Sequence, residues 1–346
     1  MDALSGLGPE ARGAEIHARP SATGNRLGHG ASARMMRKLQ RPLVALAFAG
    51  LFACSSPSAA QSRDGDTTDL TSTCEVGRDA QACLRQAIRL YEGKKQARDD
   101  VGARRFAAKA CAEGNAEGCN FLAAMLEKAI GGPADRPSAV RNYRRACFEG
   151  YANACYNLGQ LFYREAASND EVAEARALFA RGCDAHIADS CNNHAVMLKF
   201  GEGGPRDLPG ARAGFDAACT AGSNEGCTNY GYMLMMGEAG PRDIGRAAAL
   251  LDAACTAGAA NACDNMGVML MNGMNGPADF GSAGKLLRRA CTLGSHSGCF
   301  NLGQMLTKGP EHIRDPGAAN AAHKEACRLG HKQACTLTTE PRQPGA

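Results

Sequence analysis

The cysteines of this 346-residue chain follow a fixed period. Fourteen of the 17 form seven pairs with seven residues between the partners, and successive pairs lie 36 residues apart without a break. Such a period indicates stacked structural repeats, each contacting its neighbours, in place of a single globular core. The pairs are Cys111 with Cys119, Cys147 with Cys155, Cys183 with Cys191, Cys219 with Cys227, Cys255 with Cys263, Cys291 with Cys299 and Cys327 with Cys335.

An eighth pair precedes these seven. Cys83 keeps their register, and Cys74 comes one residue early. Cys54 is left without a partner, so the sequence predicts eight disulfides and one cysteine that is not part of a disulfide.

Two further columns repeat with the cysteines. An acidic residue recurs in each repeat, and an alanine follows it four residues later. The acid suits a helix N-cap or first turn, where a carboxylate meets unpaired backbone N–H groups. The alanine then lies one turn inside the helix, at a close contact. The columns are Asp99, Asp135, Glu171, Asp207, Asp243, Asp279 and Asp315, and Ala103, Ala139, Ala175, Ala211, Ala247, Ala283 and Ala319.

Glycine-proline pairs punctuate the chain between these columns, as at Gly204-Pro205 and Gly240-Pro241. They are turn signals. Each unit therefore contains one helix that starts near the second cysteine, a turn, and a second helix that ends near the next cysteine. Seven such hairpins fit between Cys83 and Cys327.

This pattern resembles the cysteine-rich Sel1-like repeat family, relatives of the tetratricopeptide repeats in exported bacterial proteins. The resemblance covers residues 74–336 and rests on Asn157-Leu158-Gly159, on Met233-Leu234, on the turn and on the Asp-x-x-x-Ala and cysteine columns. It implies an all-α, right-handed superhelical solenoid of about seven αα-hairpins stapled by disulfides. Repeat 155–183 departs from the pattern, because residues 165–169 replace the Gly/Pro turn, and we expect a different loop there.

The repeat reduces the possible disulfide pairings to two. Each seven-spaced pair closes locally, or each hairpin closes across about 28 residues, as Cys119 with Cys147. The second scheme leaves Cys74 and Cys335 without partners, and the family resemblance implies the first. We therefore predict local pairing, in an oxidising compartment. No histidine recurs with the period, so no metal site is expected.

The N-terminal region carries export signals. Residues 1–34 are interpreted as a non-structural upstream extension, with Met35 or Met36 as an alternative start. Residues 35–53 combine basic residues with a short apolar run, as a signal peptide does. Leu51-Phe52-Ala53-Cys54 resembles a lipobox, so Cys54 is predicted to be lipidated; ordinary cleavage after Ala60 is the alternative. A tether over 54–73 and a disordered tail over 337–346 complete the predicted organisation.

Charge narrows the possible partners. Residues 1–53 hold seven of the 39 Lys and Arg and three of the 35 Asp and Glu, which leaves 32 of each sign in the remainder. Residues 54–346 therefore carry no net positive charge of the kind that binds the phosphates of a nucleic acid. We expect a monomer without a cofactor, attached to a membrane only through a lipid anchor, that binds a protein or an extended peptide.

Catalytic motifs are sparse. Ser282-Ala283-Gly284-Lys285 matches the Ser-x-x-Lys of penicillin-recognising enzymes, but neither Ser-Asp-Asn nor Lys-Thr-Gly accompanies it. The resemblance still implies an alternative, because some family members have been assigned weak β-lactamase activity and penicillin binding. The sequence favours a binding protein that is not an enzyme.

A polar column offers candidate binding residues. An asparagine stands two residues after the second cysteine in five repeats. An amide there can grip the backbone of an extended peptide through both a donor and an acceptor; the alternative is that each asparagine bonds to neighbouring helix backbone and ties repeats together. Gln160, Tyr232 and Gln304, one turn on, would set side-chain preference. The column is Asn157, Asn193, Asn229, Asn265 and Asn301.

Overall fold

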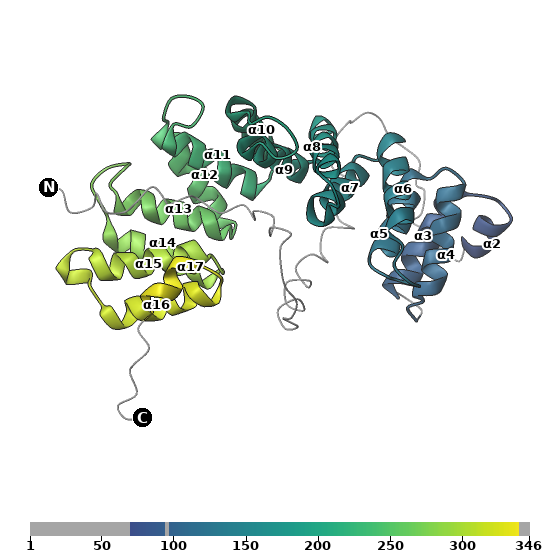
Figure 1. Cartoon of the computed structure of the whole chain (residues 1–346). Helices are drawn as coiled ribbons and strands as arrows, with labels where there is room; N and C mark the ends of the chain where they lie inside the picture. The colour runs from purple at the N-terminus through teal and green to yellow at the C-terminus, as the bar shows by residue number, and fades with distance from the viewer. Residues whose placement is uncertain (1–69, 94–96, 339–346) are drawn as a thin grey trace, which may run out of the picture. The chain divides into compact units, whose positions relative to one another are not determined.

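The computed structural model describes residues 70–93 and 97–338, which are all-α apart from one short 3-10 turn. Seven helical hairpins follow one another along the chain, with a shorter helix before the first and another after the last (Figure 1). The hairpins are α3(Ala80–Glu92)/α4(Asp100–Ala112), α5(Ala116–Glu127)/α6(Arg136–Phe148), α7(Ala152–Glu165)/α8(Asn169–Asp184), α9(Ala188–Phe200)/α10(Leu208–Thr220), α11(Asn224–Met236)/α12(Ile244–Thr256), α13(Ala260–Met271)/α14(Phe280–Thr292) and α15(His296–Lys308)/α16(Pro316–Arg328). The terminal helices are α2(Leu70–Glu75) and α17(Lys332–Leu337), and the 3-10 turn is η1(Glu311–Ile313).

Packing is sequential. Each helix packs against the helix before it and the helix after it, and the first helices of neighbouring hairpins also touch in several places, as α13 and α15 do. We call the first helix of each hairpin the A helix and the second the B helix. The predicted all-α fold of paired 36-residue repeats is confirmed.

The acidic column starts the B helices. Asp207 is the N-cap of α10, and its carboxylate accepts from the Gly210 N–H at 2.9 Å. Such a cap stabilises a helix by about 1 kcal/mol. The B helices α4, α6, α12, α14 and α16 begin in the same way. The exception is α8, where Ser168 is the cap and Glu171 lies in the first turn.

The small residues of the A helices admit large side chains from their own B helices. A Cβ added at Gly159 would come within 2.8 Å of the Phe179 ring, and one at Gly267 within 2.8 Å of Leu287. Both large side chains are fully buried. The glycine of the Asn-Leu-Gly sequence is therefore required by packing.

Eight disulfides close locally in the described residues, each joining a helix to the next at a corner between hairpins. The Cα–Cα distances lie between 4.3 and 4.8 Å. No bond spans a hairpin, so the alternative pairing of Cys119 with Cys147 does not occur there. The bonded pairs are Cys74 with Cys83, Cys111 with Cys119, Cys147 with Cys155, Cys183 with Cys191, Cys219 with Cys227, Cys255 with Cys263, Cys291 with Cys299 and Cys327 with Cys335.

Small residues before the second cysteine permit this close approach of the helices. A Cβ added at Gly226, directly before Cys227, would lie 2.5 Å from the Cβ of Ala218. Before Cys191 the residue is the larger Ser190, which fits because Gly182 stands opposite it where other repeats have alanine. At this corner the larger residue is therefore compensated by a smaller one opposite it.

Arginines of one hairpin hold the Gly/Pro turn of the next. Arg104 donates to the Pro133 carbonyl at 3.0 Å, Arg176 to that of Pro205 at 2.9 Å, and Arg212 to that of Pro241 at 3.2 Å. Repeat 155–183, which departs from the pattern, has no such turn. In the hairpin before it, Val140 stands at the position that Arg104 and Arg176 occupy in other repeats. In the departing repeat itself, α8 begins at Asn169, directly after a three-residue connection, so the loop differs as expected.

The helical array begins earlier than predicted. Helix α2 starts at Leu70, so the last four residues of the predicted tether are helical. Its Cys74 is fully buried and bonded to Cys83. The predicted signal peptide, Cys54 and most of the tail lie outside the described residues. Among the described helices, none combines the length and the apolar character that crossing a membrane requires.

Candidate binding surface on the A helices

The asparagine column lies in the second turns of α7, α9, α11, α13 and α15. Successive helical residues are turned by about 100°, so positions one, two and five after the second cysteine share one side of each A helix. We call this side of the A helices the A face. Its asparagines are half-buried except Asn265, which is 4% exposed.

Three of the five asparagines connect neighbouring repeats. In each case the side-chain amide donates to the residue directly after the second cysteine of the preceding repeat. We call each of these bonds a tie. The acceptor is a side chain, whereas the alternative to peptide binding expected bonds to the backbone of a neighbouring helix. The bonds run from Asn157 to Asn120 at 2.8 Å, from Asn229 to Asn192 at 2.9 Å and from Asn301 to Asp264 at 2.8 Å.

The other two asparagines make no such tie. Tyr156 and Thr228 occupy the acceptor positions that face Asn193 and Asn265. The Thr228 hydroxyl donates to its own helix, to the Asn224 carbonyl at 2.7 Å. Asn193 accepts a long bond of 3.4 Å from Asn192, and the buried Nδ2 of Asn265 has no partner within the described residues. Ties therefore occur at every second junction of A helices.

The third tie contains a buried charge. Asp264 is 2% exposed, and within the described residues its side chain takes part in one hydrogen bond, which it accepts from Asn301. Burial raises the pKa of Asp264 from 3.8 to about 6, and the bond from Asn301 lowers it only in part. The corresponding ties at Asn120 and Asn192 are between neutral amides.

The predicted specificity residues differ in their surroundings. Gln160 donates to the Tyr156 hydroxyl at 2.9 Å. The Lys199 ammonium lies 4.8 Å from the centroid of the Tyr232 ring and pairs with Glu238 at 2.8 Å. Gln304 is 7% exposed, and its Oε1 is buried without a partner in the described part of the chain.

Of the two basic residues at the edge of the A face, Arg164 is paired with Glu127 at 2.7 Å, and Lys308 is exposed. The structure thus brings the predicted residues to one side of the array but leaves unpartnered polar atoms only at some of them.

The sequence held a signal for this alternation. The residue directly after the second cysteine is Asn or Asp at every second repeat, where its side-chain oxygen accepts the tie. Because the asparagines themselves do not alternate, their column hides this two-repeat pattern. The residues are Asn120, Tyr156, Asn192, Thr228, Asp264 and Phe300.

The Ser-x-x-Lys sequence serves a helix start. The Ser282 N–H donates to Asp279, the N-cap of α14, at 2.9 Å. The Ser282 side chain bonds to the same carboxylate, and these bonds lower the pKa of Asp279. Lys285 is exposed. Within residues 70–93 and 97–338, no group of three or more His, Cys, Asp or Glu could hold a metal ion.

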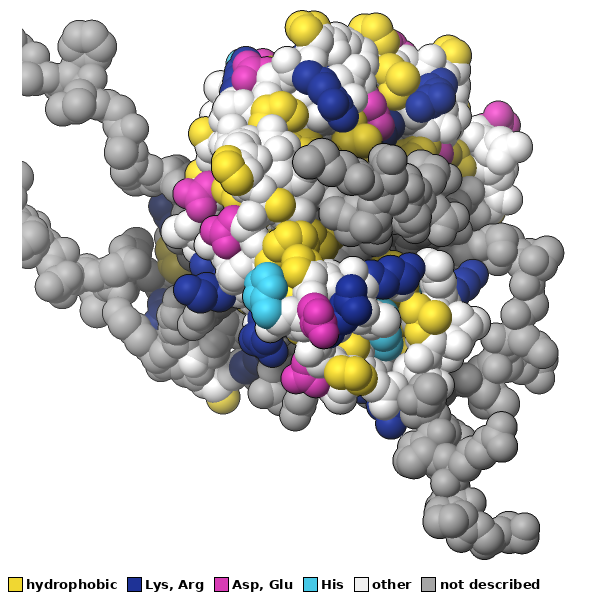
Figure 2. All heavy atoms as spheres, turned by 90° about the vertical axis from the view of Figure 1, so that its left-hand side faces the viewer, with side chains coloured by type: hydrophobic (Ala, Val, Ile, Leu, Met, Phe, Trp, Pro, Cys, Tyr) yellow, Lys and Arg dark blue, Asp and Glu magenta, His cyan; other side chains and the backbone are white. Residues whose placement is uncertain are grey.

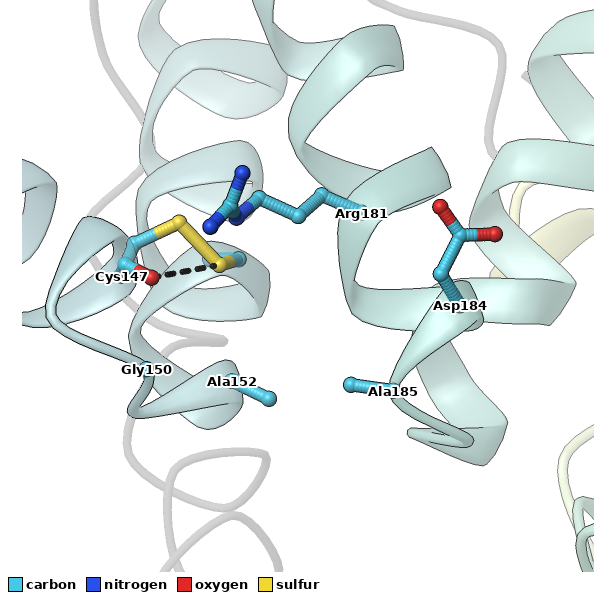
Figure 3. Close-up of a pocket in the computed structure, with 7 residues that line it drawn as sticks. Cys147, Gly150, Ala152, Arg181, Asp184 and Ala185 are labelled. Carbon is cyan, nitrogen blue, oxygen red and sulfur yellow. Dashed lines mark hydrogen bonds between the residues drawn. A yellow bond between two sulfur atoms is a disulfide. The ribbon is translucent and has the colours of Figure 1, made fainter.

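An open hollow of 360 Å³ lies away from the asparagine column, between the Cys147–Cys155 corner and the end of α8 (Figure 3). Arg181 extends toward the disulfide, and Asp184 points away from it. The Arg181 guanidinium also covers the Phe148 ring at 4.8 Å. Since no residue of the asparagine column lines this hollow, it is separate from the A face.

Charges on the array are mixed. On the face that Figure 2 shows, basic, acidic and hydrophobic side chains alternate over short distances. That face therefore carries no large area of a single sign of charge. Along the described chain as a whole, whichever face they lie on, some basic groups pair across repeats, such as Arg246 with Asp216 at 3.1 Å.

These features define a class: a disulfide-stapled scaffold of helical repeats, an architecture typical of protein binding. The chain belongs to the Sel1 repeat family. The family's repeat matches seven times in succession, over residues 80–115, 116–151, 152–186, 188–223, 224–258, 260–295 and 296–331. Each match covers one hairpin and the corner that follows it. No curated protein sequence matches the chain.

Solved bacterial structures share the fold. A protective antigen of uropathogenic Escherichia coli strains, described as displaying an SLR fold, superposes with a TM-score of 0.68 at 20% identity over 78% of this chain. The chain spans 58% of that protein's length. A Sel1 repeat protein from Oxalobacter formigenes has a TM-score of 0.60 at 20% identity, over 79% of this chain and 82% of its own. The disulfide at each corner is typical of proteins in an oxidising, extracytoplasmic compartment.

Proposed function

We propose that the chain is a binding scaffold of the bacterial envelope that holds an extended segment of another protein on its A face. The observation that supports the proposal is the presence there of buried polar atoms that have no partner among residues 70–93 and 97–338, Nδ2 of Asn265 and Oε1 of Gln304. A buried donor or acceptor left unsatisfied costs about 1–3 kcal/mol. A peptide backbone removes this cost, because it offers a carbonyl to the donor and an N–H to the acceptor.

The asparagine column contributes unequally to this binding. Asn157, Asn229 and Asn301 use their Nδ2 atoms within the array, so these three hold the A helices in register. Asn193 and Asn265 lie at the untied junctions and keep amide hydrogens for a ligand. The binding residues are accordingly a subset of the predicted column.

Photo-cross-linking tests the location of the binding surface. A photoreactive amino acid at Tyr232 of α11 samples the A face, and the same residue at the exposed Asp252 of α12 is the matched control on the neighbouring B helix. With oxidised protein in envelope extract, we expect discrete adducts from position 232 and none above background from position 252. Equal labelling from both positions, or none from 232, would contradict the proposal.

The proposal also assigns no reaction to the chain. Hydrolysis of a chromogenic β-lactam should stay at the rate of the buffer, and it should not change in Ser282→Ala. Saturable hydrolysis that this substitution abolishes would instead establish the β-lactamase alternative.

Attachment is part of the proposal. A signal peptide over 35–53 would export the chain, and a lipid on Cys54 would anchor it in the envelope. Labelling with a fatty-acid analogue should be lost in Cys54→Ala. A mature N-terminus at Gln61 would show ordinary cleavage and a secreted protein.

A further inference from the structure

One junction on the A face differs from its equivalents by a single charged atom. In the ties α5–α7 and α9–α11 the acceptor is the amide oxygen of Asn120 or Asn192. In α13–α15 the acceptor is the carboxylate of Asp264. An asparagine there would make the same bond with the same shape, so the tie itself does not require an acid.

The negative charge of Asp264 has no compensation in the described part of the chain. Its only partner is the neutral Asn301 amide. Burial and the bond from Asn301 are the causes of the pKa shift of Asp264, and no basic group of the described residues contributes to that shift. A buried charge without a counter-charge is costly. This burial also raises the pKa of Asp264 to about 6, so the group is mostly ionised at neutral pH despite that cost.

Two unpartnered polar atoms of the described residues belong to the same two helices, α13 and α15, that this tie joins. Asn265 follows Asp264 in α13, and its Nδ2 is a free donor. Gln304 lies one turn after Asn301 in α15. Viewed down the helix axis, its position falls between those of Phe300 and Asn301. Its Oε1 has no donor among the described residues. One junction therefore contains an uncompensated carboxylate, a free carbonyl oxygen and a free amide N–H.

We propose that Asp264, Gln304 and Asn265 form a subsite for a lysine or arginine of the segment bound on the A face. The cation supplies the missing counter-charge and donates to the Asp264 carboxylate and the Gln304 Oε1. The Asn265 Nδ2 donates to a backbone carbonyl beside it. This subsite rests on the proposed function and adds a sequence preference to it.

The donor set fits an organic cation better than a metal ion. Calcium takes six to eight oxygen ligands, and Mg²⁺ requires near-octahedral coordination. One carboxylate and one amide oxygen are too few for either ion, and the described residues hold no group of three potential metal-binding side chains. A lysine ammonium or an arginine guanidinium carries only donors, which two acceptors can satisfy.

A peptide array tests the subsite. The array carries acetylated, amidated decapeptides of random sequence in which one central position is fixed as lysine, arginine, norleucine or glutamate. Oxidised wild-type protein should bind the lysine and arginine sets at least tenfold more strongly than the norleucine set. In Asp264→Asn the ratio should fall to about one. Asn192→Ala, which removes an equivalent tie but leaves Asp264 in place, should retain the preference.

Three outcomes would overturn the subsite. The first is equal binding of the lysine and norleucine sets by wild type, and the second is an unchanged preference in Asp264→Asn. The third is stronger binding of a non-acetylated norleucine set, added to the array for this comparison, than of the acetylated lysine set. If these occur while position 232 still cross-links to a partner, the subsite is wrong and the proposed function stands. If position 232 does not cross-link and no peptide set binds, both are wrong.

A spectroscopic readout is independent of the affinity ratio. The carboxyl carbon of Asp264, labelled with ¹³C and assigned by its absence in Asp264→Asn, reports protonation directly. Adding a lysine peptide that the array selects should move the midpoint of its titration downward, because a nearby cation favours the carboxylate. The norleucine version of that peptide should leave the midpoint in place or raise it. No shift with the lysine peptide would contradict direct contact.

Discussion

The junctions α9–α11 and α13–α15 share one plan and differ in one atom. Each joins its A helices through an asparagine amide that donates to the residue after a cysteine. Asn192 offers an amide oxygen, whereas Asp264 offers a carboxylate and is almost completely buried. The first arrangement is sufficient to hold repeats together. The second carries the added electrostatic cost of a buried carboxylate, and a ligand that supplies the counter-charge would remove this cost.

The largest effect is expected for Asp264→Asn, which gives the second junction the chemistry of the first. The raised pKa means that the folded state binds more protons than the unfolded state between about pH 4 and pH 6. The contribution of Asp264 to wild-type stability therefore falls as pH rises through that window and is level above it. A shift of about two pKa units corresponds to about 3 kcal/mol at pH 7, which the variant should regain.

Urea unfolding at pH 4 and at pH 7 measures this difference. The variant and the wild type should be alike at pH 4, where Asp264 is largely protonated, and should diverge by pH 7. Equal stabilities at pH 7 would show that the carboxylate is compensated within the protein.

A second titrating group, His323, lies one hairpin further on. Its pKa shift is opposite in direction to that of Asp264. His323 occupies the core position of α16 that Leu287 fills in α14, against Gly303. Burial lowers the pKa of His323, and the nearby His331 and Lys308 lower it further. Its contribution is present above the ordinary histidine pKa and is lost as pH falls below about 6.5.

We expect His323→Leu to stabilise the last hairpin by about 1–2 kcal/mol at pH 5, because a leucine fills the site without a charging cost. The gain should shrink toward pH 8. Amide hydrogen exchange in α15 and α16 would locate it, with α5 and α6, which contain no histidine, as the internal reference. An equal gain at both pH values would exclude titration of His323 as the cause.

The reciprocal change, Asn192→Asp, places a carboxylate in the first junction. The bond from Asn229 remains possible, but the half-buried charge should cost about 1 kcal/mol at neutral pH. Thermal melting at pH 4 and pH 7 should reveal a loss of stability at pH 7, relative to the wild type, that is smaller or absent at pH 4. Lysine binding in the array should not rise, because no free Gln304 equivalent lies there: the corresponding residue is Tyr232.

The smallest effects separate tied from untied asparagines. Asn229→Ala removes a tie and should lower stability by about 1 kcal/mol. Asn193→Ala, one repeat earlier at an untied junction, should change stability by less than about 0.5 kcal/mol. Melting temperature and peptide affinity measured on both variants test the assignment. A loss of affinity without a loss of stability in Asn229→Ala would reverse the roles given to the two classes.

Much of this architecture follows from the sequence alone. The 36-residue spacing, the capping acids and the Gly/Pro signals determine where helices start and stop, because each acts within a few residues along the chain. Local disulfide pairing follows for the same reason, since cysteines eight or nine residues apart span one corner, as Cys255 and Cys263 do. The loop of the departing repeat, over residues 165–169, was also recognisable from its missing turn signal. The start of the array at Leu70 was not, because no cysteine or Gly/Pro signal marks it.

The roles of the polar column were decided only by tertiary structure. Five asparagines occupy one sequence position, yet Asn229 binds a neighbour and Asn265 keeps a free donor. Whether an asparagine is tied depends on the side chain 37 residues earlier. It also depends on the rotation between repeats, which brings position two of one A helix beside position one of the previous A helix. The burial of Asp264 arises in the same way. Spacing along the chain determines helices, but contacts between stacked helices determine which polar atoms are satisfied and which remain for a ligand.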